Sequence, residues 1–503
     1  MKKNLLLIIV FLGLVACDDF LEPKSDTLYI PKDVVSLDEM LLGSAYPRAA
    51  QTSVVLNAGI QFLDDDVSFT TVSGTVSSYD EPKFVAMKYL YSWHPEMFQE
   101  MAKPYGFYRG MWESQYKLIL GANAALDYVD GVTGTIDEKT LVKAQAYALR
   151  ALYEFNLVNL FGEPYNHNPQ ALGIPLRLSS GVEKDEIARN TVGEVYEQVI
   201  KDLNEAERLY MELPKNLQYR QDMRTSLPMV QLLKSRVFLY MENWKEAARY
   251  AKKVIDEWDF SLVDLNMLEL GTTYRTYYPF ISQEASDVIW VYGSISDIST
   301  YYGLTLSVNY TSRKVFLASP ELIAGFKEGD LRKEWYVYRE SDSKTSPYAD
   351  VFLNYGKNVS SYSNSLDGNC FLLSFRLAEA YLNLAEAAAF DGDAETALRV
   401  LNDLREKRFT PEAPNIEVSG LTGDALVNKI REERRQELCF EFHRWFDLRR
   451  YGMPSIKHVW NMGGMTEEFV LQEKDPGYTL PIPEVVMNQN RALIQNKLAE
   501  PKF

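Results

Sequence analysis

The stretch LLSFRLAEAYLNLAEAAAFDGDAETALRVLNDLREKR, Leu372–Arg408, has the apolar spacing of two helices that pack against each other. Apolar residues recur three and four positions apart on both sides of Gly392, which marks a turn. Ala385 precedes Ala397 by twelve positions, and small residues at such a pair let two backbones approach closely. The stretch therefore predicts a hairpin of two antiparallel helices.

A second stretch, VQLLKSRVFLYMENWKEAARYAKKVI (Val230–Ile255), repeats this design around Glu242 and Asn243. Ser235 precedes Ala247 by the same twelve positions. This spacing matches the contact between the two helices of a tetratricopeptide repeat. Ordinary helix hairpins also need small residues at close contacts, so the spacing alone leaves both alternatives open.

Further helices are expected nearer the N-terminus. The run Lys143–Phe161 places its apolar residues on one face, and Gly162 ends it. Thr191 is followed three residues later by Glu194, the pattern of a capping box. It predicts the start of a helix that ends before Pro214.

Two segments differ from this helical pattern. In residues 261–370, Gly, Ser, Thr and Tyr replace Ala, Leu and Glu, and the piece DVIWVYGS predicts a short strand. Residues 60–112 have a similar character. The predicted fold is therefore mainly α, built from tetratricopeptide-like helix pairs with irregular loop and short-strand insertions. We expect the binding residues in these insertions, because loops on a rigid scaffold commonly carry function.

The N-terminus has the pattern of a lipoprotein signal peptide. Lys2 and Lys3 form a basic start, Leu5 to Val15 an apolar run too short to span a bilayer, and Ala16 precedes Cys17. A plain secretory peptide is the alternative. Residues 1–16 are predicted to be removed, so that Cys17 carries a diacylglycerol and an acyl chain such as palmitate and anchors the protein to a membrane.

Residues 17–30 are predicted to be a tether, followed by one body over residues 31–503. Asp18, Asp19 and Glu22 resemble the surface-export signal of Bacteroidetes-type lipoproteins, although a solvated tether has the same composition. The body divides into an N-terminal part (31–260, with the insertion 60–112), a variable ligand-loop region (261–370) and a C-terminal helical part (371–503).

The charge excludes several classes of partner. Removal of residues 1–16, which carry two lysines and no acid, takes the formal charge from −17 to −19. An acidic body does not fit nucleic acid or electrostatic adhesion to anionic lipid. Cys370 and Cys439 are expected to be free buried thiols, with a bridge between them as the alternative.

The chain has few residues arranged for catalysis or metal binding. Its four histidines are scattered and form neither HExxH nor a Cys/His cluster, and no GxSxG or Walker loop occurs. We expect neither an enzyme nor a cofactor. Asp64, Asp65 and Asp66 lack the alternating spacing of a calcium loop, so a solvated acidic turn is expected, with a structural calcium ion left open.

Aromatic residues make up 13% of the chain, and many tyrosines fall outside the helical pattern. Exposed rings beside Asn or Arg can hold a sugar face, or an extended peptide, whereas rings that merely pack beneath loops are the alternative. The candidate ligand-binding residues are Trp93, Tyr274, Tyr277, Tyr278, Tyr301 and Tyr302.

The segment IREERRQELCFEFHRWFDLRRYG, Ile430–Gly452, alternates acids with arginines. On one helix, Glu433, Glu437 and Glu441 would pair with arginines three and four positions away, and buried pairs would fix the register. A glycosidase acid pair of Glu437 and Glu441 is the enzymatic alternative, but arginines would keep both ionised. The residues assigned a structural role are Arg434, Glu437, Glu441, Arg444 and Trp445.

This segment closely resembles the signature of the SusD/RagB family of outer-membrane lipoproteins. The runs AYALRALYEFNLVNLFGEP, ARNTVGEVYEQVIKDLNEA, FRLAEAYLNLAEA and YTLPIPEVVMNQNRALIQN resemble the family in matching order. The resemblance implies four tetratricopeptide-like helix pairs and no catalytic activity. It also implies a place on the outer membrane, facing the exterior, and a SusC-like TonB-dependent transporter as partner. The expected cargo is a glycan, with a peptide, or a structural lid that binds weakly, as alternatives.

Overall fold

The structure of the chain is a computed structural model, and the residues that it describes do not include every predicted site residue. Cys17, Tyr274, Tyr277, Tyr301, Tyr302 and Cys370 lie outside them. The described residues are 31–47, 56–57, 59–71, 74–78, 80–103, 110–181, 186–269, 278, 280–293, 304–308, 311–339, 352–353, 357, 371, 373–462 and 464–503.

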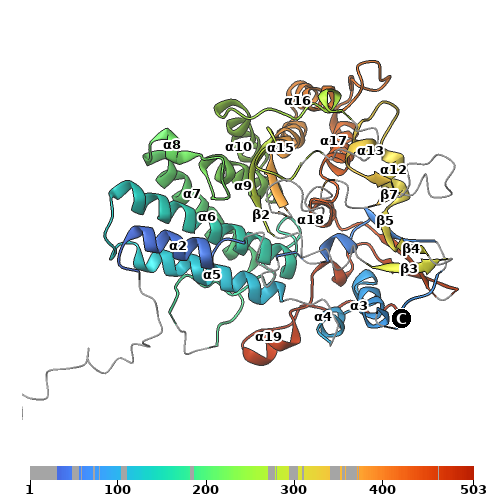
Figure 1. Cartoon of the computed structure of the whole chain (residues 1–503), viewed down its shortest axis with the longest axis horizontal. Coiled ribbons are helices and arrows are strands. Elements are labelled where there is room, and N and C mark those ends of the chain that lie inside the picture. The colour runs from blue at the N-terminus through green and yellow to red at the C-terminus, as the bar shows by residue number, and fades with distance from the viewer. Residues whose placement is uncertain are drawn as a thin grey trace, which may run out of the picture.

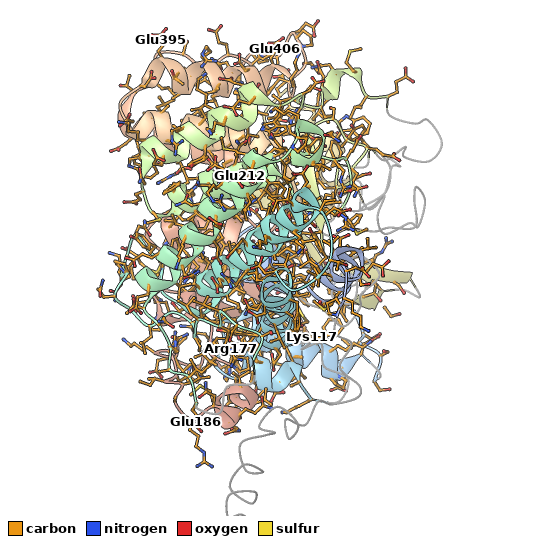
Figure 2. All side chains as sticks on the ribbon, turned by 90° about the vertical axis from the view of Figure 1, so that its left-hand side faces the viewer. Lys117, Arg177, Glu186, Glu212, Glu395 and Glu406 are labelled. Carbon is orange, nitrogen blue, oxygen red and sulfur yellow. The ribbon has the colours of Figure 1, made fainter. Side chains whose placement is uncertain are left out.

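Four helix pairs form a row along the left and the top of the molecule (Figure 1). Within this row, α5 packs on α6, α7 on α9 and α10 on α15. Figure 2 shows the outer side of the row, from α16 with Glu395 and Glu406 toward α5 with Lys117. The predicted tetratricopeptide-like architecture is confirmed. The pairs are α2 (Val34–Ser44) with α5 (Met111–Tyr128), α6 (Ile136–Phe161) with α7 (Val192–Glu212), α9 (Leu227–Tyr240) with α10 (Trp244–Glu257), and α15 (Leu377–Phe390) with α16 (Ala394–Glu406).

Local sequence signals explain where these helices begin and meet. Thr191 and Glu194 form the predicted capping box at the start of α7, and the helix ends at Glu212, as expected. Between α9 and α10, the Ser235 hydroxyl donates a 2.9 Å hydrogen bond to the Ala247 carbonyl. The small residue at this position therefore permits a direct contact between a side chain and the neighbouring backbone.

The two insertions come together in one antiparallel sheet of order β1-β5-β7-β6. Val67 of β1, from residues 60–112, is paired with Ala318 of β5, from residues 261–370. Three two-stranded sheets, β2-β8, β3-β4 and β9-β10, complete the described strands. The strands are β1 (Val67–Phe69), β2 (Val288–Tyr292), β3 (Thr305–Val308), β4 (Thr311–Lys314), β5 (Phe316–Ala318), β6 (Tyr338–Arg339), β7 (Phe352–Leu353), β8 (Leu373–Arg376), β9 (Ile456–Met462) and β10 (Met465–Leu471).

The insertion 60–112 also contains helices that its composition did not predict. α3 buries Phe84, Met87 and Leu90 against the rest of the molecule, so its stability comes from packing rather than from a repeated local pattern. None of the helices in the described part of the chain is long and apolar enough to cross a membrane. The remaining helices are α3 (Glu81–Tyr91), α4 (Met97–Met101), α8 (Lys215–Gln218), α12 (Pro320–Gly325), α13 (Arg332–Trp335), α17 (Gly423–Glu437), α18 (Arg444–Arg450) and α19 (Glu484–Gln489), with 3-10 turns η1 (Ile60–Phe62), η2 (Leu265–Met267) and η4 (Pro476–Tyr478).

The signature segment is not one continuous helix, which corrects the prediction for Glu441. α17 ends at Glu437 and α18 begins at Arg444. Between them Phe440 and Phe442 adopt φ values of 63° and 65°, a left-handed conformation that side chains other than glycine rarely accept. Both rings are buried, and their burial stabilises the turn that interrupts the helix.

Candidate functional site

The carboxylates of the signature segment bind cations that come from other parts of the chain. Glu437 is fully buried and accepts hydrogen bonds from Arg408 Nε at 2.8 Å, Arg376 Nη1 at 3.2 Å and the Tyr336 hydroxyl at 3.0 Å. Tyr336 belongs to the variable region 261–370, and Arg376 ends β8, which pairs with β2 of that region. Glu437 therefore joins that region to the helical body.

Glu433 and Glu441 make the same kind of connection. Arg332 of α13 lies 2.6 Å from Glu433, and Arg405 of α16 pairs with the same carboxylate. Lys357 Nζ donates to Glu441 Oε1 at 2.6 Å and lies 4.0 Å from the centre of the Tyr336 ring. The variable region is thus held to the signature segment by buried ion pairs.

This arrangement corrects the predicted pairing within the segment. The described partners of the three glutamates lie outside residues 430–452, and Arg434 binds Asp447, thirteen positions away, at 2.8 Å. The sequence missed Lys357, Arg332 and Arg376 as partners. Their local sequence gives no signal of which acid lies opposite, because the three glutamates lie at least 61 positions away along the chain.

The charge network keeps the signature acids ionised. Burial by itself would raise the pKa of Glu437, but Arg408 and Arg376 hold it below its ordinary value. The pKa of Glu441 is lowered in the same way by Arg376 and Lys357, against the effect of burial. A glycosidase acid needs a raised pKa and access to a sugar, and these two carboxylates have neither.

The segment of three consecutive aspartates is held by ion pairs with arginines and is not a solvated turn, which corrects the prediction. Asp64 and Asp66 are each only 2% exposed. Asp65 accepts hydrogen bonds from Arg444 Nε and Nη2 at 2.6 and 2.8 Å, and Asp66 accepts one from Arg435 Nε at 2.7 Å. These pairs attach the insertion 60–112 to the signature segment.

The three aspartates differ in pKa: burial raises the pKa of Asp66 although Arg435 lies beside it, and Asp65 alone has a lowered pKa. Burial and the neighbouring carboxylates of Asp66 and Asp65 raise the pKa of Asp64 well above its ordinary value. For Asp65, Arg444 outweighs burial and lowers the pKa. No group of three or more His, Cys, Asp or Glu within the described residues is arranged to hold a metal ion.

Trp93 does not offer a ring to a ligand in this structure, which contradicts its prediction as an exposed contact. Its side chain is 0% exposed. The indole Nε1 donates to the Leu63 carbonyl at 2.9 Å, and the ring stacks on His458 with centroids 4.2 Å apart. Trp93 therefore connects the insertion to β9 inside the core.

Of the five predicted tyrosines, Tyr278 is the one that the structure places. It is half-buried and packs on Phe280, with ring centroids 4.8 Å apart. Burial, helped by the nearby carboxylate of Asp287, raises the pKa of Tyr278. Phe280 in turn contacts Tyr336 at 5.1 Å, so a row of rings leads from the half-exposed Tyr278 to the buried Glu437.

Three pockets are lined by described residues, and Tyr278 lines none of them. An enclosed cavity lined by Tyr292, Ser374, Glu441 and His443 admits only water-sized groups. The Ser374 hydroxyl finds no protein partner there, as is typical of a group that binds a buried water. Two open grooves, one between α4 and α19 and one over α6 between α5 and α7, have volumes of about 900 and 810 Å³.

Two family descriptions match most of this chain. One, the SusD family, matches residues 327–498, and the other, described as starch-binding and associating with the outer membrane, matches residues 19–227. The chain is also similar to SusD-like protein P2 of Formosa agariphila, with 28% identity over 429 residues that cover 76% of this chain and 79% of that protein. SusD-like protein P25 of the same organism is 23% identical over 68% of this chain and 70% of its own length.

Solved structures share the fold over nearly the whole length. A SusD superfamily protein from Bacteroides thetaiotaomicron has a TM-score of 0.67 and 22% identity, covering 92% of this chain and all of its own. A laminarin-binding SusD-like protein has a TM-score of 0.61 and 21% identity, covering 93% and 99%. The two family matches, over residues 19–227 and 327–498, show that the chain belongs to the SusD/RagB family, whose fold these solved structures share.

Proposed function

We propose that this chain is a lipoprotein of the outer-membrane surface that captures a glycan and passes it to a SusC-like TonB-dependent transporter. The observation that carries the proposal is the match of residues 19–227 to a family described as starch-binding and associating with the outer membrane. A neighbour with the same fold binds laminarin, which supports a glycan as cargo. The run Leu14-Val15-Ala16-Cys17 supports lipid attachment at Cys17.

The binding face that we propose lies where the variable region meets the signature segment. Tyr278 is its described ring, and Tyr274, Tyr277, Tyr301 and Tyr302 are proposed to belong to the same face. The buried pairs of Glu437 and Glu441 give this face a fixed support, because each ion pair inside the protein holds a strand or loop in one position. A pre-organised support lowers the entropy that is lost when a sugar binds.

Replacement of Tyr278 by alanine is expected to weaken glycan binding about fivefold, because a ring that stacks on a sugar contributes about 1 kcal/mol. Calorimetry on residues 18–503 with laminarihexaose, maltohexaose, xylohexaose and tetra-alanine measures the effect. Tyr381→Ala is the matched control, since Tyr381 is a half-buried tyrosine on α15.

Three results are informative in this experiment. Saturable binding of one glycan that Tyr278→Ala weakens and Tyr381→Ala does not would support the proposal. Binding of tetra-alanine alone would replace the glycan by a peptide as the cargo. Glycan binding that is equal in both variants would remove Tyr278 from the proposed face.

A further inference from the structure

Two rings stack on each other at the surface, where two consecutive hairpins turn. Trp244 is the first residue of α10 and Phe390 the last of α15. Their ring centroids are 4.1 Å apart and their planes differ by only 7°. Phe390 remains 38% exposed and Trp244 is half-buried. Each ring therefore covers one face of the other, and the pair is fixed on the helical scaffold.

Polar residues continue this surface. The guanidinium of Arg431, on α17, lies 3.9 Å from the centre of the Tyr451 ring and 5.4 Å from that of Phe390. Asn166 Nδ2 donates to Glu242 Oε1 at 2.8 Å, and Glu242 lies two residues before Trp244. We call this set the hairpin-tip platform: Asn166, Glu242, Trp244, Phe390, Arg431 and Tyr451.

Arg450 connects Asn166 with Tyr451 and fixes both of them to the protein beneath. The Arg450 carbonyl accepts a second hydrogen bond from Asn166 Nδ2 at 2.9 Å, and its guanidinium lies 4.4 Å from the centre of the Tyr451 ring. Beneath them Glu386, which is 0% exposed, accepts hydrogen bonds from Arg450 at 2.8 and 2.7 Å and from Arg431 at 3.3 Å. The rings and the guanidinium are thus held in place before any ligand arrives.

The local charge is balanced. Burial would raise the pKa of Glu386, but Arg450 and Arg431 hold it below its ordinary value, so it is ionised. Arg431 and Arg450 both bind Glu386, and the other carboxylate of the platform, Glu242, is bound by Asn166. Asp447 also pairs with Arg450, but it is shared with Arg434. A balanced surface of this kind favours a neutral ligand over an anionic one.

Several polar groups of the platform have no protein partner among the described residues. These groups are the indole Nε1–H of Trp244, the two Nη groups of Arg431, Oδ1 of Asn166 and Oε2 of Glu242. Donors and acceptors that surround half-exposed rings match the hydroxyl groups around the flat faces of a pyranose. A purely apolar ligand would leave these donors and acceptors without hydrogen-bond partners.

We propose that the hairpin-tip platform is a second glycan-binding surface, which takes a pyranose ring of a neutral oligosaccharide by stacking on the face of Trp244 that Phe390 does not cover. Its hydrogen bonds come from Asn166, Glu242 and Arg431. The proposal rests on the proposed function for the class of ligand, but it uses residues that the loop face does not contain. A second surface on the scaffold lets one polysaccharide chain be held at two points, which raises its effective affinity.

Fluorine NMR on the mature chain, residues 17–503, labelled with 5-fluorotryptophan, tests the platform. The eight tryptophans give separate probes, and Trp244→Phe assigns the Trp244 resonance. The Trp244 resonance is expected to shift saturably with one of laminarihexaose, maltohexaose or xylohexaose. Trp258 is the control, because its indole already donates to Gln231 at 2.8 Å, and its resonance is expected to stay in place.

The double variant Asn166→Ala with Glu242→Gln is expected to weaken the Trp244 response at least fivefold, since it removes the Asn166 amide, replaces an acceptor oxygen of Glu242 by a donor and leaves the rings. Calorimetric binding with an unmoved Trp244 resonance would overturn the platform and leave the proposed function intact. A Trp244 shift without any effect of Tyr278→Ala on affinity would support the platform and count against the loop face. If none of the three glycans gave a heat of binding or a shift of the Trp244 resonance, both proposals would be overturned.

Discussion

Glu437→Gln is expected to lower the free energy of unfolding by about 3–5 kcal/mol, because it leaves buried arginines without their counter-charge. The Glu437 carboxylate is fully buried and lies between Arg408 and Arg376. Glutamine has nearly the same shape as glutamate but no charge, so the substitution leaves almost no cavity. The loss of stability therefore measures the cost of the unpaired arginines. Urea unfolding followed by circular dichroism measures the difference.

Two companion variants separate charge from general damage. Glu432→Gln lies on the same helix but is exposed, and its pair with Lys429 at 3.4 Å is expected to contribute less than about 0.5 kcal/mol. Adding Arg408→Met to Glu437→Gln is expected to recover part of the loss, because one unpaired charge is removed. A Glu437→Gln variant as stable as Glu432→Gln would contradict the role of the network.

The cost of Glu437→Gln is also expected to depend on pH. The folded-state pKa of Glu437 lies below the ordinary value of 4.5, so the folded protein binds fewer protons than the unfolded chain. The stabilisation is fully present above about pH 4.5 and is lost as the pH falls through the folded-state pKa. Unfolding at pH 7 and near pH 3.5 should show the two proteins converge in acid. A gap that widens on acidification would refute this assignment.

Arg444→Met is expected to destabilise the protein by about 2 kcal/mol, with the effect concentrated in the insertion 60–112. Arg444 forms two hydrogen bonds with Asp65, at 2.6 and 2.8 Å, in a partly buried position. Its loss leaves Asp65 with Arg435 alone, at 3.4 Å. The estimate is smaller than for Glu437 because Asp65 keeps 32% of its side chain exposed.

Hydrogen exchange gives the location of this effect. Amides of β1 and α3 are expected to exchange faster in Arg444→Met, whereas those of α9 and α10 keep their protection. Arg399→Met is the control, because Arg399 and Asp403 form an exposed pair on α16. Uniformly faster exchange over the whole chain would show that Arg444 supports the global fold rather than the insertion.

Much of the helical fold follows from local sequence, because a helix is specified by neighbours three and four positions apart. The capping box at Thr191, the turn at Gly392 and the close contact of Ser235 with Ala247 were all predicted and are present. The strand in DVIWVYGS was predicted as well, and β2 is fully buried. The resemblance in the signature segment identified the family, since it rests on ordered motifs that survive at low identity.

Local patterns failed where a long-range contact determines the structure. Four-residue spacing placed Glu441 on a helix, but burial of Phe440 and Phe442 ends the helix before it. Acid composition indicated a solvated turn at Asp64 to Asp66, whereas arginines from about 370 residues away bury it. Trp93 was predicted to be exposed because it is an aromatic residue in an insertion, but its ring stacks on His458 and is buried.

The sequence by itself determined the helix pairs, the acidic charge and the family, because each depends on neighbouring residues or on residue order, and it predicts lipid attachment at Cys17. Only the tertiary structure decided which charges pair and which rings remain at the surface. Lys357 meets Glu441 across 84 positions, and Trp244 meets Phe390 from another hairpin. Such contacts depend on how whole elements pack, and no spacing within a single segment encodes the distance between two segments.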